Sequence, residues 1–391
     1  MSMGAKRQPA SADEQDALIL QSVDRFLERD VRPVAHALEA ADTYPAAIVE
    51  KLKALGLFGA TIAPEYGGLG LSAVTYAKVV DRVSAAWMSI AGVFNAHLIM
   101  AGAVQRYGTS EQRRHWLPRF ASGELRGALA LTEPDCGTDL QAIRTHARRE
   151  GEHYVVNGAK TWITNSIEGQ ILAVLLKTDA RAQPPYKGMS LLLIEKGTGF
   201  KVVRKLDKLG YRGIDTAELL FEDCRVPAAN LIGTAEGRGL QQVLAGLELG
   251  RINVAARGAG LARACLEESL RYAQQRKSFG VPIAEHQAIQ LKLADMATRV
   301  EAARLLTEAA ARAYDAGGRC DLEAGMAKLY ATESALENSL EAMRIHGAYG
   351  YSKEFNIERY YRDAPLLAIG EGTNELQRII IARELVKRYP V

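Results

Sequence analysis

Apolar residues recur at the spacing of a helix face through the first third of the chain. The first such face contains Leu18, Val23, Phe26 and Leu27. This texture continues to about Gly123, and its main break lies at residues 64–68. We therefore expect an all-helical N-terminal domain over residues 1–124.

The middle of the chain changes to short runs rich in β-branched and aliphatic residues. These runs are residues 154–156, 171–176, 190–194 and 218–221. Runs of this length are typical of strands, and the dipeptide Asn157 and Gly158 is a common hairpin turn. We expect a small β domain over residues 125–235, with a hairpin at Asn157 and Gly158.

Long amphipathic segments return after about Glu236 and continue to Lys387. In one of them Leu266, Leu270 and Ala273 lie on one side and charged residues lie on the other. Long helices with few breakers pack readily as a bundle. The expected fold class is therefore α+β, with a helical bundle over residues 236–391.

Composition excludes several classes of protein. The 391 residues are 48% hydrophobic, enough for a large core, and the net charge is only +3 with scattered basic residues. This pattern argues against nucleic-acid binding. Apolar runs such as residues 171–176 are too short to span a bilayer, and residues 1–13 contain no apolar signal core. We expect neither membrane insertion nor secretion.

The spacing of the cysteines indicates a reducing compartment. They lie far apart, without CxxC spacing or a companion histidine pattern: Cys136, Cys224, Cys265 and Cys320. We expect reduced thiols, a cytoplasmic protein and no metal site.

Residues 68–73 fit the G-x-G-x-x-A dinucleotide pattern. A true fingerprint follows a strand and opens a helix, whereas this one follows Pro64 within a helical domain. The context argues against a nicotinamide nucleotide site.

Glu371 stands between Gly370 and Gly372, just before a helical stretch. Flanking glycines let the backbone approach a ligand closely, and nearby apolar residues including Leu367 and Ile369 would strip water from the carboxyl. Such a carboxylate suits a general base. The alternative is a carboxylate satisfied by the first-turn amides of the helix, and this stretch alone does not decide between them.

Several dispersed motifs, taken together, decide the interpretation. They are residues 131–139 (LTEPDCGTD), 160–165 (KTWITN), 276–280 (RKSFG), 285–287 (EHQ), 344–350 (RIHGAYG) and 369–375 (IGEGTNE). In this order and spacing they resemble the acyl-CoA dehydrogenase family over nearly the whole chain. The resemblance implies an N-terminal helical domain, a central barrel-like β domain and a C-terminal four-helix bundle around FAD.

The implied reaction is α,β-desaturation of an acyl-CoA thioester to a trans-2-enoyl-CoA. Glu371 matches the base that takes the α-proton, flavin N5 accepts the β-hydride, and the amide of Glu371 helps to polarise the thioester carbonyl. A branched-chain subgroup carries its base on another helix, at the position of Gly250. Since this chain has glycine there, we expect the base to be Glu371.

The resemblance also implies the binding residues. Those for FAD are Leu131, Thr132, Gly137, Thr138, Trp162, Thr164, Arg276, Ser278, Phe279, His286, Gln287, Arg344, Ile345, His346, Gly347, Ala348, Thr373 and Glu375. Those for the substrate are Thr138, Glu248, Arg251 and Gly372. In the family, the stretches around Arg276 and Arg344 reach the flavin of a neighbouring subunit, which implies a homotetramer.

Simpler interpretations exist for single positions. Alternation along a half-buried strand favours Trp162 in the core, and Arg276 alone suits a solvated helix C-terminus. Near Trp87, where a glutaryl-type enzyme has a carboxylate-binding arginine, this chain has Met88 or Ser89. We therefore expect an apolar acyl tail.

The resemblance implies electron transfer to an electron-transfer flavoprotein. An acyl-CoA oxidase on the same scaffold is the nearest alternative, because oxygen access is not readable from sequence. A flavin monooxygenase would need no α-proton base, and a non-catalytic acyl-CoA-binding protein would be expected to have lost Glu371 or Trp162.

Overall fold

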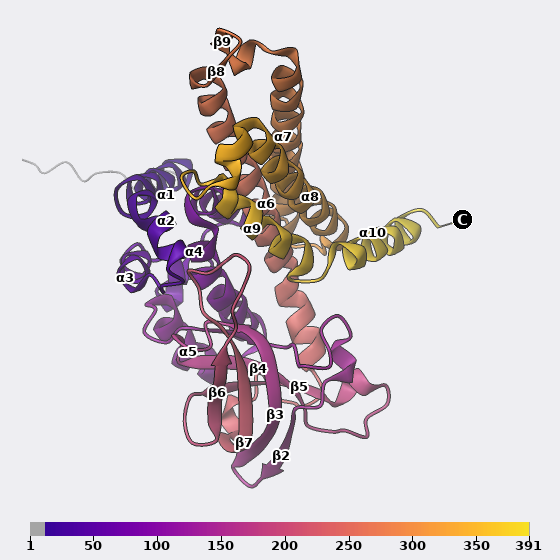
Figure 1. The fold of residues 1–391 in the computed structure, drawn as a ribbon. Coiled ribbons are helices and arrows are strands. Elements are labelled where there is room, and N and C mark those ends of the chain that lie inside the picture. The colour runs from indigo at the N-terminus through magenta and orange to yellow at the C-terminus, as the bar shows by residue number, and fades with distance from the viewer. Residues whose placement is uncertain (1–11, 391) are drawn as a thin grey trace, which may run out of the picture.

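The computed structural model describes residues 12–390, in which helices come first, then a sheet, then further helices (Figure 1). The N-terminal helices are α1 (Ala12–Phe26), α2 (Arg32–Ala40), α3 (Ala46–Ala54), α4 (Ala73–Tyr107) and α5 (Ser110–Ala121). The main strands are β1 (Gly127–Ala130), β2 (His146–Glu150), β3 (His153–Thr164), β4 (Ile171–Lys177), β5 (Met189–Glu195), β6 (Phe200–Lys205) and β7 (Thr216–Pro227). The later elements are α6 (Gly239–Gln275), β8 (Lys277–Ser278), β9 (Val281–Pro282), α7 (Gln287–Asp315), α8 (Asp321–His346), α9 (Ile357–Ile369) and α10 (Asn374–Arg388). The predicted fold class is confirmed; residues 1–11, considered above for a signal core, lie outside the described part.

The first predicted helix face packs as expected at three of its four positions. Val23, Phe26 and Leu27 are at most 3% exposed, but Leu18 is 57% exposed. A five-residue step turns an α-helix by about 500°, so Leu18 lies on a different side from Val23. The prediction was wrong for Leu18 because the spacing was not helical there.

Helix α4 is the central helix of the N-terminal part. Its length and apolar composition would permit a membrane span, but 89% of its most apolar window is buried inside the protein. At Trp87 the backbone leaves helical geometry, with φ −160° and ψ 106°, so two helical segments meet there. The apolar character of α4 reflects its place in the core.

The central sheet has seven strands, in the order β1-β4-β2-β3-β7-β6 with β5 paired to β4. All four runs predicted as strands lie within β3, β4, β5 and β7. The hairpin predicted at Asn157 and Gly158 is wrong: β3 continues through both residues, and the pairing with β7 shifts register there. Gly158 has φ +139°, and a Cβ would lie 2.6 Å from the Cα of Thr145, so glycine serves a bulge at this point.

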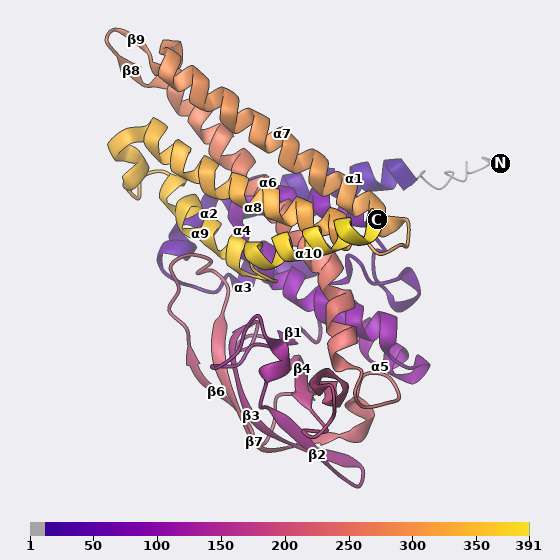
Figure 2. The same ribbon diagram turned by 90° about the vertical axis from the view of Figure 1, so that its right-hand side faces the viewer.

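Helix α6 links the two helical parts. It packs along α4 on one side and along α7 and α8 on the other, while α9 and α10 pack against α8. Figure 2 shows α6, α7 and α8 running side by side above the sheet. The contact between α4 and α6 forms two walls of the site described below.

The glycines of residues 68–73 form a tight turn. The preceding residues Pro64–Tyr66 form a 3-10 helix rather than a strand, and Ser72 caps α4. A Cβ at Gly68 would lie 2.0 Å from the carbonyl oxygen of Ile62. Close backbone packing therefore accounts for this motif.

Candidate active site

Glu371 lies in the short turn between α9 and α10. Its φ is +54° and that of Gly372 is +89°, so two consecutive residues occupy the left-handed region. The side chain of Thr373 caps α10 by accepting a hydrogen bond from Leu376 N. Because Thr373 serves as the cap, the carboxylate of Glu371 turns away from the helix to the interior of the protein.

The two oxygens of Glu371 have different surroundings. Oε1 accepts hydrogen bonds from Asn95 Nδ2 and Arg257 Nη2, each at 3.1 Å. Oε2 is buried and has no hydrogen-bond partner among the described residues. A Cβ at Gly250 would lie only 2.3 Å from Oε2, so this glycine provides the space that the oxygen occupies.

Burial raises the pKa of the Glu371 carboxyl above its ordinary value, and the positive charge of Arg257 opposes this shift. The burial comes from α4 and α6 rather than from the neighbours in sequence on which the prediction relied. Leu367 is buried, but Ile369 is 65% exposed. The raised pKa and the unpaired Oε2 together give Glu371 the properties of a general base.

Lys328 in α8 anchors the turn that carries Glu371. Its fully buried ammonium group donates to the carbonyl oxygens of Ala368 at 3.2 Å and Gly372 at 2.9 Å, and to Asn374 Oδ1 at 2.8 Å. Burial lowers the pKa of Lys328 to about 8. Three acceptors on both sides of Glu371 hold the strained turn in place.

The walls of the site are polar near Glu371. Asn95 Oδ1 accepts from the hydroxyl of Tyr76 at 3.1 Å, and that hydroxyl accepts from Asn253 Nδ2 at 2.9 Å. Arg257 Nη1 donates to the hydroxyl of Tyr211 at 3.2 Å. A connected polar network therefore surrounds the carboxylate between α4 and α6.

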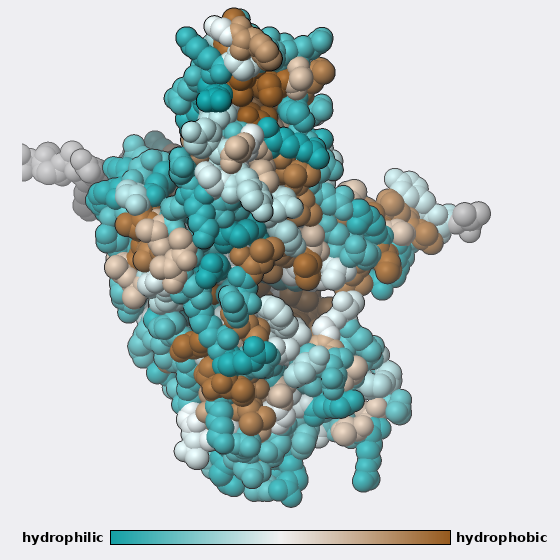
Figure 3. Space-filling view, viewed as in Figure 1, coloured by the Kyte–Doolittle hydropathy of each residue, from teal (hydrophilic) through white to brown (hydrophobic). Residues whose placement is uncertain are grey.

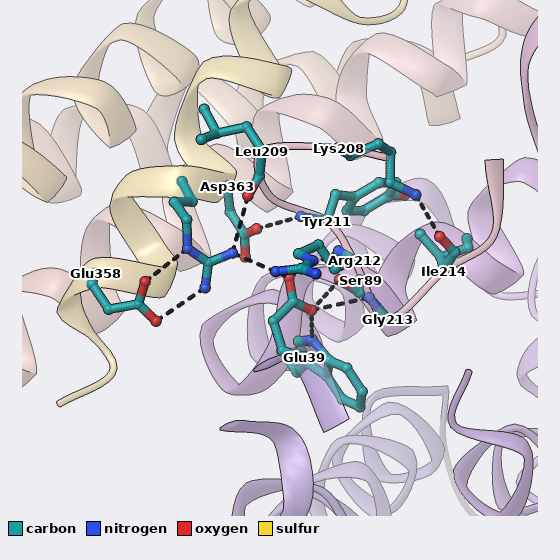
Figure 4. A network of polar contacts seen from close by, with 12 residues as sticks. Glu39, Ser89, Lys208, Leu209, Tyr211, Arg212, Gly213, Ile214, Glu358 and Asp363 are labelled. Atoms are coloured by element: carbon teal, nitrogen blue, oxygen red, sulfur yellow. Dashed lines mark hydrogen bonds and ion pairs between the residues drawn. The ribbon is translucent and has the colours of Figure 1, made fainter. Parts of the chain in front are cut away.

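Two further buried carboxylates hold the loop that carries Tyr211 (Figure 4). Glu39 accepts from the main-chain N–H groups of residues 212 and 213, at 2.8 and 3.1 Å. Asp363 accepts from Tyr211 N at 2.6 Å, and burial raises the pKa of Asp363 to about 7. Tyr211 has φ +58°, and these contacts fix it where its hydroxyl meets Arg257.

The predicted substrate residues Glu248 and Arg251 lie on α6, on either side of Gly250 in the sequence. Arg251 is 5% exposed and forms an ion pair with Asp321 at 2.9 Å. Glu248 is 7% exposed, and burial and the nearby Asp321 raise its pKa. Both residues belong to a cluster of charges that includes Asp321.

The loop of residues 131–138 is fastened to β3 by a buried ion pair. Lys160 Nζ lies 2.8 Å from Glu133 Oε1 and donates to the carbonyl oxygen of Leu131 at 2.9 Å. Glu133 also accepts from the main chain of residues 144 and 145. Thr132 is half-buried in this loop, whereas Gly137 and Thr138 are exposed at its end.

Trp162 is outside the core, so the simpler interpretation from strand alternation is wrong. Its side chain is 58% exposed and its φ is +61°. The register of β3 against β7 shifts between Lys160 and Ile163, which turns the indole outward. Two residues further along the strand, Thr164 is half-buried. An exposed indole of this size suits a surface on which a planar ring stacks.

The other predicted cofactor residues lie elsewhere. Phe279 is 97% exposed at the β8–β9 hairpin, and Ser278 Oγ is 2.9 Å from His286 Nε2. Arg276 is exposed at the C-terminus of α6, and Gln287 is exposed at the start of α7. Both ribbon views place this hairpin at the opposite end of the molecule from the sheet that carries Trp162 (Figures 1 and 2).

The stretch after Arg344 divides into buried and exposed parts. Arg344 is exposed and pairs with Glu341, while Ile345 and His346 are buried in their own chain. Gly347 and Ala348 are exposed. Near Glu371, Gly372 contributes its carbonyl to Lys328, and Glu375 is exposed in the first turn of α10.

Four residues of the site were missed by the sequence analysis: Asn95, Tyr211, Arg257 and Lys328. Arg257 had a signal, because it is a lone charge between the apolar and small residues 254–256 and 258–262, seven positions after Gly250. That spacing places both residues on the same side of α6. Tyr211 and Lys328 had none, since their roles depend on contacts between distant segments.

The chain matches three family models in succession. They are described as the N-terminal, middle and C-terminal domains of acyl-CoA dehydrogenase and match residues 13–124, 128–224 and 237–386. The chain belongs to the acyl-CoA dehydrogenase family. It is therefore an oxidoreductase of the acyl-CoA dehydrogenase type.

Individual relatives agree with this family over nearly their full lengths. Acryloyl-CoA reductase (NADH) of Anaerotignum propionicum is 39% identical over 98% of this chain and 97% of the relative. Human mitochondrial short-chain specific acyl-CoA dehydrogenase is 39% identical over 98% and 92%, respectively. The structure of butyryl-CoA dehydrogenase from Megasphaera elsdenii superposes with a TM-score of 0.92 at 33% identity, covering 97% of this chain and 100% of that one.

Proposed function

We propose that the protein desaturates an acyl-CoA thioester to the trans-2-enoyl-CoA, with Glu371 taking the α-proton while the β-hydrogen leaves as hydride. The observation that carries this proposal is the asymmetry of the carboxylate. Arg257 and Asn95 hold Oε1, whereas Oε2 is buried without a partner beside Gly250. Oε2 is thus available to accept a proton in an environment with little water.

The α-C–H of a thioester is a weak acid, so negative charge developing on the carbonyl oxygen has to be stabilised. The main-chain N–H of Glu371 is the proposed donor, and the Lys328 contacts hold the turn in which it lies. In the reverse direction the same carboxyl returns the proton. This agrees with the relative named acryloyl-CoA reductase.

FAD is the proposed cofactor, and it supplies the acceptor for the β-hydride when bound. Trp162 supports this assignment because its indole is exposed on a strand bulge. Hydroxyl groups of Thr132, Thr138 and Thr164 lie on the same loop and strand, and the Lys160 ion pair fixes the loop. These residues would hold the flavin end of the cofactor, and an electron-transfer flavoprotein would reoxidise it.

The active unit is proposed to be a cytoplasmic homotetramer. In one chain, the β8–β9 hairpin that carries Phe279 lies at the opposite end of the molecule from the sheet that carries Trp162 (Figures 1 and 2). A second copy would bring the two groups together. Phe279, Tyr351 and Val386 are at least 73% exposed, and hydrophobic side chains gather near the β8–β9 tip (Figure 3).

The visible spectrum tests the central proposal. We expect purified protein to carry FAD, and an acyl-CoA added without oxygen to bleach the flavin. Butyryl-, octanoyl-, isobutyryl- and glutaryl-CoA cover the main acyl types. Protein that takes up no FAD, or FAD that none of these compounds reduces, would contradict it. Rapid reoxidation by oxygen alone would identify an acyl-CoA oxidase instead.

Light scattering tests the oligomer. FAD loss and subunit dissociation should rise together on dilution, because each site needs two copies. An FAD-saturated, active monomer would contradict the shared site.

A further inference from the structure

Arg257 is a buried cation whose one close anionic partner among the described residues is Glu371. Its side chain is 6% exposed, and Nη2 lies 3.1 Å from Glu371 Oε1. Its other close contacts are neutral: the hydroxyl of Tyr211 at 3.2 Å and the face of that ring, 5.9 Å from the guanidinium carbon. Nε has no hydrogen-bond partner within the part of the chain that the structure describes. A buried guanidinium in this position depends on one carboxylate.

The proposed reaction removes that partner. When Glu371 takes up the α-proton it becomes neutral, and Arg257 is left as a buried charge without an anion. An unpaired buried charge is strongly unfavourable. An uncharged acyl tail beside Arg257 would make this worse, because it would also exclude water from the guanidinium.

Arg257 lies farther along α6 than Gly250, on the same side of the helix. Gly250 adjoins the basic oxygen of Glu371, and Arg257 follows seven residues later, about two helical turns along α6. On the facing helix, Gly92 leaves space for the hydroxyl of Tyr211, since a Cβ there would lie 1.3 Å from that oxygen. Beyond Gly250, this side of α6 therefore carries a guanidinium that contacts a phenol hydroxyl.

We propose that Arg257 binds a carboxylate at the far end of the acyl group, so that the substrate is a short acyl-CoA with an anionic tail. This proposal rests on the function proposed above. The substrate carboxylate takes the place of Glu371 on Arg257 and releases Glu371 to face the α-carbon. This proposal replaces the apolar acyl tail that was expected from Met88. The arginine that would bind the carboxylate, Arg257, lies on α6 rather than on α4.

The distances limit the length of the acyl group. An α-carbon in position for proton transfer lies about 3–3.5 Å from Oε2. A carboxylate paired with a guanidinium lies about 2.7–2.9 Å from its nitrogens. Because Arg257 itself is 3.1 Å from Glu371, only one or two carbons fit between the α-carbon and the distal carboxylate. Acyl groups of four or five carbons meet this condition.

Flavin reduction by two five-carbon thioesters, glutaryl-CoA and pentanoyl-CoA, tests the proposal. In the wild-type holoenzyme we expect kcat/KM to favour glutaryl-CoA by at least about tenfold. Arg257→Gln should lower that ratio by about a hundredfold, because it removes the charge partner of the substrate. Arg257→Lys keeps the charge without the fork and should give an intermediate ratio.

Arg263→Gln is the matched control. Arg263 lies on the same helix and pairs with Asp81 and Glu267, away from Glu371. This variant should keep the wild-type ratio. A preference of the wild type for pentanoyl-CoA, or an unchanged ratio in Arg257→Gln, would overturn the proposal.

Binding to the Glu371→Gln protein separates this inference from the proposed chemistry. Calorimetry should show tighter binding of glutaryl-CoA than of pentanoyl-CoA, and the difference should disappear when Arg257→Gln is added. If neither thioester reduces the flavin of the wild type, the proposed function fails, but the binding preference still decides the role of Arg257. Equal affinities would refute that role even in an active enzyme.

Discussion

Glu39 and Glu371 are both acids in the protein interior, yet their hydrogen-bond partners differ. Glu39 accepts from Trp87 Nε1, Ser89 Oγ and two main-chain N–H groups, so both of its oxygens are occupied (Figure 4). Within residues 12–390, Glu371 has two donors on one oxygen and none on the other. A buried carboxylate can therefore accept a proton from a ligand only where one of its oxygens has no donor already bound to it.

The two acids also join different parts of the chain. Glu39 connects α2, α4 and the loop before β7, whose Tyr211 contacts Arg257. Glu371 depends on that arrangement for the position of Arg257. Glu39, whose oxygens are both hydrogen-bonded, thus helps to hold the surroundings in which Glu371 reacts.

Removal of the proton-accepting oxygen of Glu371 should have the largest effect on the reaction rate. Glu371→Gln should retain FAD and bind acyl-CoA, but flavin reduction should fall by about three powers of ten or more, because the proton acceptor is gone. Stopped-flow measurement of flavin bleaching gives the rate. Reduction at nearly the wild-type rate would exclude Glu371 as the base.

Loss of the Glu39 carboxylate should instead lower the stability of the folded protein. Glu39→Ala leaves four donors, three of them buried, without their acceptor and should lower the free energy of unfolding by about 3–5 kcal/mol. Urea unfolding with FAD at fixed concentration measures this change. The control Glu50→Ala removes an exposed partner of Lys53 and should change stability by less than about 0.5 kcal/mol. Equal effects of the two substitutions would contradict the role of Glu39.

Asp363 is a third buried acid, and its raised pKa predicts a stability that depends on pH. Its pKa in the folded protein is about 7, above the ordinary value, so the folded state holds this proton more tightly than the unfolded chain. Its contribution to stability is complete below pH of about 4 and is lost as pH rises through about 7. Asp363→Asn should reduce the loss of stability between pH 5 and pH 8 by about 2 kcal/mol. An unchanged difference between these pH values would show that Asp363 is ionised throughout.

The smallest expected effect concerns the pH profile of the base. Burial raises the pKa of Glu371, and Arg257, Lys328 and Arg251 oppose that shift, as does the hydrogen bond from Asn95. Below its pKa the carboxyl is protonated, so kcat/KM for pentanoyl-CoA should fall about tenfold per pH unit. Arg257→Gln should move the midpoint to higher pH, because a stabilising cation is gone. A midpoint that moves equally in Arg263→Gln would indicate a general structural effect.

Most of the fold could be predicted from the sequence because helix and strand patterns are local. The order of helices, sheet and helices follows from apolar spacing, as do the strands that contain residues 171–176 and 190–194. Asn157 and Gly158 show the limit of this approach. The same dipeptide that closes a hairpin also suits a bulge, and pairing with β7 decides between them.

The site was less accessible from sequence. The glycines beside Glu371 pointed to an unusual turn, and its positive φ agrees. The partners of the carboxylate come from α4, α6 and α8, so Asn95, Arg257 and Lys328 become neighbours only through packing. The expectation of an apolar acyl tail was based on Met88 in α4 alone. Arg257, on which the proposed anionic tail depends, lies in α6.

Gly250 has a consequence for the history of such enzymes. A side chain at residue 250 would begin 2.3 Å from Glu371 Oε2, so the turn and the helix compete to place an acid at one point. A lineage that moves the acid from one element to the other passes through a protein with two crowded acids or with none. Either ancestor would be a poor catalyst, so descendants should inherit the position of the acid as a fixed trait and diverge mainly in the residues around it.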